Sequence, residues 1–389
     1  MTALLKPTGS PAERFTSRDP EAFETPSSRD EDWRFSPLTK LRAFFEPFTE
    51  DLVVTGSTTV PDGARVDAVD PQTVLGFGSV LTPADRASAV AMAQARKGTH
   101  TVTDAGAELA EPVVIERIGI SGRGYSHHII EAGANSHATV VFDHRGALSV
   151  SGNVEIIVGD GAELTLVAIY DCDPSAVVLV AHAAKVGRDA TFRHVNIGLG
   201  GGVVRIVPTV QYAGPGGRAE LLGVAFAGAG QHIETRLFVD HAVPQCSSDV
   251  LYKHALSGDT ARTVWIGDVR IRPAATGTQT YEMNRNLLLS DGARADSVPN
   301  LEIQTGNIAG AGHASATGRF DDLQLFYLQS RGIPEDVARR LVVRGFFADV
   351  VERIGIAALQ QRVMTTIEAR LGFPKNDIES DDSVEEDDE

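Results

Sequence analysis

VEIIVGDGAELTLVAIY, residues 154–170, contains two runs of apolar, strand-forming residues joined by a Gly-Asp-Gly turn. The same alternation continues further along the chain, for example in AVVLVAHAAKV at 176–186 and VVRIVPTVQYAG at 203–214. Val and Ile favour strands, whereas Gly, Asp and Asn mark the turns between them. No long helical period interrupts this pattern for about two hundred residues. The sequence therefore predicts a core built almost entirely of short strands.

A turn followed by alanine recurs at a nearly fixed spacing through this region. Ala134, Ala162, Ala190 and Ala219 lie 28, 28 and 29 residues apart. A constant period of this size in an all-strand region is typical of a β-solenoid, in which each coil stacks on the previous one. The period drifts after residue 219, and a sandwich or barrel is the structural alternative.

The N-terminal part of the chain differs from this central region. Residues 1–75 are expected to form an arm and a docking segment, because the chain begins with a polar stretch and then brings in the aromatic residues of EDWRFSPL at 31–38. The solenoid core is expected to span 76–320. An alanine-rich stretch at 82–97 inside it predicts a helix.

The C-terminal part reads as helical. Gly332 fits the residue that ends one helix, and Pro334 the start of the next. Apolar residues at helical spacing continue beyond, so 321–373 is expected to be a C-terminal helical domain with a wide apolar stripe that something must cover. Residues 374–389 have the composition of an acidic disordered tail.

Composition limits the classes of function. The net charge of the 389 residues is −17, and the acidic tail carries about half of it. The rest of the chain is mildly acidic and has no basic patch, so a nucleic-acid partner is not expected. No secretory signal and no apolar run of membrane-spanning length occur, so a cytoplasmic location without a membrane partner is expected. Two cysteines, Cys172 and Cys246, are too few for a disulfide scaffold and fit a reducing compartment.

Motifs for catalysis or nucleotide binding are not found. The chain has no phosphate loop of the G-x-x-x-x-G-K-[ST] type, so we expect it to bind no nucleotide. The glycine-rich stretch 198–202 is better explained as a turn than as a phosphate cradle. No CxxC or HExxH spacing suggests a metal site, and both cysteines are interpreted as incidental. A Ser-His-Asp arrangement is spatial and stays open, although no G-x-S-x-G elbow supports one.

One histidine stands out among eleven. His313 lies in GAGHAS, where small neighbours leave an imidazole accessible. The other histidines are scattered, and a lone histidine is usually structural. His313 is therefore the residue most worth testing for a functional role on chemical grounds.

Three stretches resemble the SufB/SufD family of iron–sulfur cluster assembly proteins. They are LYKHALSGDTARTVWIGDVRI at 251–271, TQTYEMNRNLLLSDGARADSVPNLEIQTGNIAGAGHASATGRFDDLQLFYLQSRGIP at 278–334, and ARRLVVRGFFADVVERI at 338–354. EDWRFSPL is similar to a short aromatic motif near the N-terminus of SufD members. The resemblance implies a right-handed parallel β-helix core with N-terminal and C-terminal helical elements.

The resemblance also implies a function. It points to a non-catalytic scaffold subunit that pairs with a SufB-like subunit, and to a transient iron–sulfur cluster shared with that partner. The histidine motif of SufD falls on His313, which would supply a ligand at the heterodimer interface. The cysteine position of SufB falls near Ala293, where this chain has no thiol, so SufD is favoured over SufB. Many SufD members have Cys-Ser-His where this chain has Ala311-Gly312-His313.

The family further implies a SufC-like ABC-type ATPase, recruited through the C-terminal helices. Arg331, Arg344, Phe346 and Phe347 are the expected contributors, although packing within the helical domain is the simpler explanation for the two phenylalanines. A cysteine desulfurase system and recipient apo-proteins would act with the complex indirectly. Two alternatives stay open: a SufB-type scaffold, and a carbohydrate-acting parallel β-helix enzyme, which would present carboxylate or arginine clusters on one solenoid face.

Overall fold

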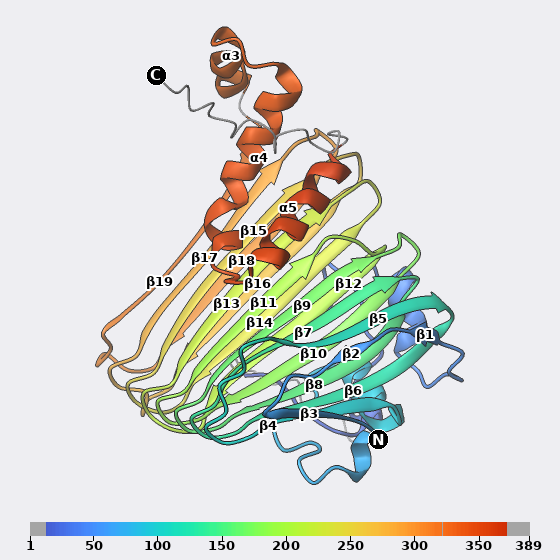
Figure 1. Ribbon diagram of the computed structural model, residues 1–389, viewed down its shortest axis with the longest axis vertical. Coiled ribbons are helices and arrows are strands. Elements are labelled where there is room, and N and C mark those ends of the chain that lie inside the picture. Colours follow the sequence, from blue (N-terminus) through green and yellow to red (C-terminus); the bar gives the residue numbers. More distant parts are fainter. Residues whose placement is uncertain (1–12, 321, 372–389) are drawn as a thin grey trace, which may run out of the picture. The chain divides into compact units, whose positions relative to one another are not determined.

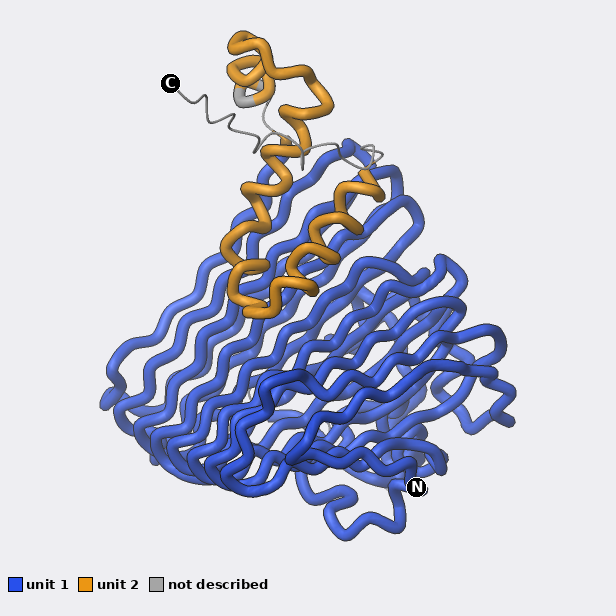
Figure 2. The backbone as a smooth tube through the Cα atoms, viewed as in Figure 1, with its two compact units in different colours: residues 1–319 blue, residues 320–389 orange. Residues whose placement is uncertain are grey.

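The computed structural model describes residues 13–320 and 322–371. The chain divides into two compact units, Met1–Arg319 and Phe320–Glu389 (Figure 2). Each unit is described by itself below. The predicted acidic tail, 374–389, lies outside the described residues.

The first unit is a β-solenoid made of two long sheets (Figure 1). Successive strands alternate between the sheets, and within the described residues each sheet contains eight parallel strands. One sheet holds β5 (Val113–Ser121), β7 (His137–Gly146), β9 (Glu163–Cys172), β11 (Thr191–Gly198), β13 (Arg218–Ala227), β15 (Ser247–Leu256), β17 (Gln279–Leu288) and β19 (Gly310–Arg319). The other holds β4 (Gly98–Thr103), β6 (Arg123–Ala132), β8 (Ser149–Val158), β10 (Val177–Val186), β12 (Val203–Tyr212), β14 (His232–His241), β16 (Arg262–Ile271) and β18 (Arg294–Ile303). The predicted mainly β, solenoid fold is confirmed.

The core of the solenoid lies between the two sheets. Every second residue of each strand points inward, so equivalent positions of successive coils stack into rows along the solenoid. Val140, Leu166 and Leu221 belong to one such row and are fully buried. The repeat is 28 residues where Val177 meets Ser149 and 32 residues where Thr280 meets Ser248. The coils therefore lengthen toward the C-terminal end, which explains the drift of the sequence period.

The alanine repeat holds in only one of its three intervals. Ala162 and Ala190 do occupy equivalent positions, since Glu163 pairs with Thr191. Ala134 and Ala219 are each two residues out of register, because His137 pairs with Glu163 and Ala219 pairs with Phe192. The turns of successive coils differ in length by one or two residues, so a marker residue in a turn does not fix the register.

The N-terminal part of the chain closes the first coil. β1 (Val53–Thr55) and β2 (Thr58–Thr59) pair antiparallel with β5, and β3 (Ala64–Val69) pairs antiparallel with β4. These strands cover sheet edges that would otherwise be open to association. Residues 53–69, which were assigned to the arm and docking segment, thus extend both sheets.

Two short helices before these strands hold aromatic residues against the solenoid. α1 (Leu38–Leu41) and the following 3-10 turn Arg42–Phe44 belong to a cluster that reaches Leu179 and Val203 on the strands. Its other buried members are Trp33, Leu41, Phe44, Phe45 and Ala87. The EDWRFSPL stretch therefore packs as a structural anchor. α2 (Arg86–Gln94) begins at Asp85, whose side chain accepts a hydrogen bond from the Ser88 N–H and caps the helix.

The second unit contains three helices in its described part. They are α3 (Asp322–Ser330), α4 (Glu335–Glu352) and α5 (Ala357–Arg370). Gly332 and Gly355 have φ of +86° and +75°, the left-handed conformation that ends helices. Among the described residues, the structure has no helix both long and apolar enough to cross a membrane.

Candidate functional site

The last coil, formed by β18 and β19, places His313 next to a buried carboxyl group. His313 pairs in register with Glu282 of β17, which pairs in turn with Val250 of β15. Side chains at paired positions of neighbouring strands lie on the same face of a sheet. This inward row is apolar apart from His194 up to Val250, and it ends in Glu282 and His313. Glu282 is fully buried, whereas His313 is exposed at the open end of the solenoid.

Two neighbouring rows become polar at the same place. One runs from Tyr252 through Asn284 to Ser315, and the other from His254 through Asn286 to Thr317. Asn286 Nδ2 donates to Thr317 Oγ1 at 3.1 Å, so these two side chains lie on the same face of the sheet. A polar interior at one end of a solenoid fits an end that meets water or a partner.

Glu282 has an unusual environment. Neither of its carboxylate oxygens has a hydrogen-bond partner in the described part of the chain. Burial raises the pKa of the Glu282 carboxyl to about 8, and the negative charge of Asp268 adds to the effect. Gly267 of β16 faces the carboxylate from the opposite sheet, and a Cβ at that position would overlap Glu282 Oε2 and the Trp265 ring. The glycine thus provides the space that the carboxylate occupies.

The outer edges of the last coil are open. In the described part of the chain, no strand pairs with the outer edge of β18 or β19, the end strands of the two sheets. β19 reads GAGHASATGR, so most of its side chains are very small. Natural proteins usually protect such an edge with charges, bulges or a covering segment. An unprotected ten-residue edge of small side chains can be approached closely by another strand.

Donor groups in the first unit do not form a closed metal site by themselves. Within residues 13–320 and 322–371, no group of three or more His, Cys, Asp and Glu side chains is placed to hold a metal ion. Cys172 and Cys246 are both buried and unbridged. Ala293, at the position of the SufB cysteine, is also buried. His313 and Glu282 can therefore offer an incomplete set of ligands that needs a second molecule.

The predicted docking residues of the helical unit have different surroundings. Arg331 and Arg344 are exposed; the guanidinium of Arg331 lies 4.8 Å from the centre of the Tyr327 ring, and Arg344 donates to Glu368 at 2.8 Å. Phe346 is half-buried, and it packs edge to face against Phe347, which is fully buried. Phe347 therefore cannot contact a partner in this conformation, because its ring is already covered.

Part of the apolar stripe that is expected on the C-terminal helices is exposed on α3. Leu323, Phe326 and Tyr327 lie at helical spacing on α3 and expose more than half of their surfaces. Arg331 extends this surface beyond the end of the helix, through its contact with Tyr327. We call these four residues the α3 face. Exposed apolar patches of this kind mark binding surfaces more often than chance.

Comparison with known proteins identifies the family of this chain. Residues 118–346, which run from β5 into α4 and include all of the last coils, match the family model described as "SUF system FeS cluster assembly, SufBD core domain". The chain belongs to the SufBD family.

Several relatives of this SufBD protein are similar over nearly their whole length. The chain is 50% identical over 374 residues to "Iron-sulfur cluster assembly SufBD family protein Rv1462" of Mycobacterium tuberculosis, covering 92% of each chain. It is 47% identical over 370 residues to the SufBD family protein ML0594 of Mycobacterium leprae, covering 92% of this chain and 93% of the relative. A second protein of M. tuberculosis, Rv1461, is 31% identical over 204 residues, which are 52% of this chain and 24% of that protein.

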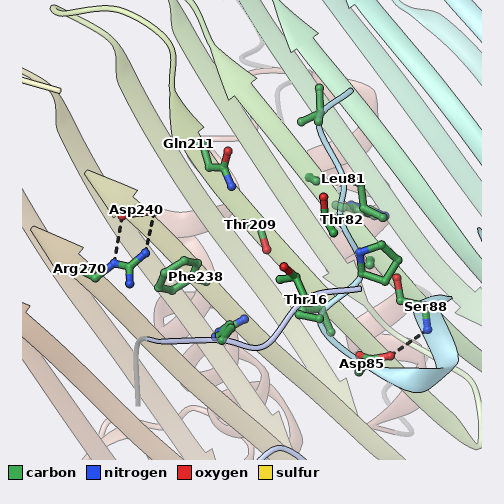
Figure 3. Close-up of a pocket in the computed structure, with 18 of the residues that line it drawn as sticks. Thr16, Leu81, Thr82, Asp85, Ser88, Thr209, Gln211, Phe238, Asp240 and Arg270 are labelled. Carbon is green, nitrogen blue, oxygen red and sulfur yellow. Dashed lines mark hydrogen bonds and ion pairs between the residues drawn. The ribbon is translucent and has the colours of Figure 1, made fainter. Parts of the chain in front are cut away.

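A groove of this SufBD protein lies on the outer face of the sheet formed by β10, β12, β14 and β16, beneath an N-terminal segment that includes Thr16 (Figure 3). Its volume is about 500 Å³. Asp240 lies at one end, where both oxygens accept hydrogen bonds from Arg270 and Arg272 at 2.6–3.2 Å. Burial opposes ionisation of Asp240, but the two arginines hold its pKa below the ordinary value. A carboxylate bound in this way is a poor general acid, so the groove does not favour the carbohydrate-acting alternative.

Proposed function

We propose that this SufBD protein is a SufD-type scaffold subunit that pairs through its last coil with a SufB-type subunit and docks an ABC-type ATPase on its helical unit. The observation that carries the proposal is the open last coil, whose polar interior ends in His313. A heterodimer formed there would cover both strand edges and bring a second set of ligands to the imidazole.

The ligand chemistry supports an iron–sulfur cargo. Iron accepts imidazole nitrogen together with thiolate sulfur. This chain offers the imidazole of His313 but no thiol at the equivalent of the SufB cysteine, near Ala293. The partner would supply that thiolate, so a cluster would form only in the heterodimer, as transient cargo in the cytoplasm. The scaffold itself would need no catalytic residue and no nucleotide.

The relatives support a partner from the same family. M. tuberculosis has one relative that matches this chain over nearly its full length and another that matches over 204 residues, a quarter of its own length. M. leprae has the same two kinds, ML0594 and ML0593. We infer that this chain is one of two unlike subunits, and that the longer kind is the SufB-type partner.

The α3 face is the proposed docking surface for the ATPase. It presents Leu323, Phe326 and Tyr327 as an apolar patch with the guanidinium of Arg331 at its border. Arg344 and Phe346 on α4 remain proposed contributors. Phe347 is left out, because it is buried.

Pairing and cluster assembly are tested together by coexpressing the chain with the SufB-type and ATPase proteins of the same organism. The purified complex is then reconstituted anaerobically with iron and sulfide, using wild type and His313→Ala. We expect the variant complex to assemble intact but to lose most of its cluster absorption and its transfer to an apo-ferredoxin. Unchanged cluster formation would remove His313 from the mechanism, and failure of the wild-type chains to associate would refute the SufD-type assignment.

Docking of the ATPase is tested by Phe326→Ala combined with Leu323→Ala. We expect this double variant to lose the ATPase while it keeps the SufB-type subunit, because the two surfaces lie in different units. Ile120→Ala is the matched control: it removes an exposed apolar side chain from β5, far along the chain from α3. Retention of the ATPase by the double variant would contradict the proposed docking surface.

A further inference from the structure

Glu282 is a residue whose burial has no structural explanation. A carboxyl group that is buried without a hydrogen bond costs several kcal/mol relative to water, and this cost is normally offset by a partner. Glu282 is fully buried, and its two oxygens have no such partner in the described residues. The same row is filled by Val250 in the preceding coil, so an apolar side chain would suit the fold.

The opposite sheet is shaped around the carboxylate. Gly267 lies in the middle of β16, where glycine weakens a strand because it adds no packing. A side chain at this position would overlap Glu282 Oε2, so the glycine keeps the carboxylate extended across the interior. The cost of both residues to stability suggests that the carboxylate is retained for a function.

The register pairs Glu282 with His313 on the neighbouring strand. The two residues are paired on neighbouring parallel strands and share the inward face, about 4.8 Å apart along the hydrogen-bonding direction. Only the last coil covers Glu282, and the residues that flank His313 on its inward face are Ala311 and Ser315. The covering layer is therefore thin on the side that opens toward the proposed partner.

We propose that Glu282 and His313 form a ferrous-ion half-site, in which this chain supplies one carboxylate oxygen and one imidazole nitrogen before sulfide and the partner's ligands complete the coordination. The inference rests on the proposed function, and it deepens that function by naming a second ligand. Carboxylate and imidazole are the ligands that Fe(II) and Co(II) accept when no thiolate is present. One ion bound by two protein ligands keeps open positions for the partner.

The test uses the purified full-length chain alone and Co(II), a spectroscopic substitute for Fe(II), under anaerobic conditions. Binding is followed by visible absorption and by isothermal titration calorimetry. We expect one Co(II) per wild-type chain, with affinity reduced by about tenfold or more in both Glu282→Gln and His313→Ala. The affinity of the double variant for Co(II) should lie within a few-fold of the affinity of the weaker single variant. Either substitution alone already removes the half-site.

Glu163→Gln is the matched control. Glu163 also pairs in register with a histidine, His137, at 3.9 Å, but both side chains are exposed, by 62% and 68% respectively. This variant should bind Co(II) as the wild type does. Equal thermal melting of the Glu282→Gln and wild-type proteins, or a higher melting temperature for the variant, would show that a weakened affinity does not come from misfolding.

The outcomes separate this inference from the function on which it rests. Wild-type affinity in Glu282→Gln, or no Co(II) bound by the wild type, would overturn the half-site even if the complete complex assembles clusters. The expected Co(II) pattern in a chain that never associates with a SufB-type protein would leave the half-site standing and overturn the scaffold assignment.

Discussion

Single glycines in the strands of this solenoid are matched to bulky side chains in adjacent layers. A Cβ on Gly223 would overlap the ring of Tyr252, its paired residue in the next coil, and a Cβ on Gly267 would overlap Glu282 and Trp265. Interiors are close-packed, so a large side chain at one position requires a small one where it points. Each such pair should therefore behave as one unit when it is mutated.

Gly267→Ala is expected to destabilise the protein by about 1–3 kcal/mol, because its methyl group overpacks the interior. The loss should be smaller in a Glu282→Ala background, because the overlap with the carboxylate is gone although the overlap with the Trp265 ring remains. The measurement is the free energy of unfolding from denaturant titration of all four combinations.

Gly306→Ala serves as the control for this cycle, since a Cβ there meets nothing within 4 Å. It should change stability by less than about 0.5 kcal/mol. Equal costs of Gly267→Ala in both backgrounds would show that the glycine does not make room for Glu282.

At the scale of elements, Arg205 of β12 joins three segments that are distant in sequence. Its Nε donates to Glu234 Oε1 at 3.2 Å, its Nη1 to the helix-capping Asp85 at 3.2 Å, and its guanidinium lies 4.0 Å from the centre of the Trp33 ring. The N-terminal segment, α2 and the solenoid thus share one buried cation.

Arg205→Ala is expected to cost about 3–5 kcal/mol, because it leaves the buried carboxylate of Glu234 without this partner. The N-terminal segment should also become more sensitive to limited proteolysis. Arg193→Ala breaks the more exposed Arg193–Glu220 pair and should cost at most about 1 kcal/mol. Equal effects of the two substitutions would refute the role given to Arg205.

Elements were easier to predict than register. Periodic apolar runs and the stop at Gly332 are local signals, so the strands and helices could be predicted from the sequence. Register depends on turn length, and the turns differ in length. For this reason Ala134 and Ala219 do not occupy the equivalent positions that the spacing predicts. The predicted fold class was still correct, because coils of different lengths can stack on one another.

The candidate site was only half predictable. His313 was found through its small neighbours and through family resemblance. Glu282 was missed, because its importance comes from a neighbour one coil away and from Gly267 in the opposite sheet. One signal was available: Thr280, Glu282, Asn284 and Asn286 put polar residues at four successive inward positions of one strand, which is unusual for a core strand.

At the scale of the whole solenoid, the interior contains a set of buried neutral histidines. Burial lowers the pKa to about 3 for His144 and His254 and to about 4 for His194 and His241. His182 Nδ1 lies 2.9 Å from His194 Nε2, so two of these imidazoles are directly hydrogen-bonded. The unfolded chain accepts protons on these side chains near pH 6.5, whereas the folded chain does not.

The contribution of these histidines to stability is therefore expected to be full above pH 6.5 and to be lost as the pH decreases toward 4. Each buried histidine changes the free energy of unfolding by roughly 1.4 kcal/mol per pH unit in this window. Glu282 has a raised pKa and therefore acts in the opposite direction, with one proton between about pH 8 and 4.5. Denaturant titrations at several pH values measure the slope.

His254→Gln should reduce this slope by about one proton. A slope that is insensitive to His254→Gln would mean that this imidazole is already protonated in the folded state.

The unpaired outer edge of β19 has a consequence for the amount of this chain that a cell can maintain. Ribosomes make the solenoid from its covered end toward its open end, so each new coil has a finished template and the unprotected strand is completed last. A molecule that finds no partner keeps the outer edge of β19 unpaired. Such an edge can pair with the edge of another copy, which leads to aggregation or degradation. We therefore expect surplus copies to be short-lived, and the steady level of this subunit to follow the amount of its counterpart.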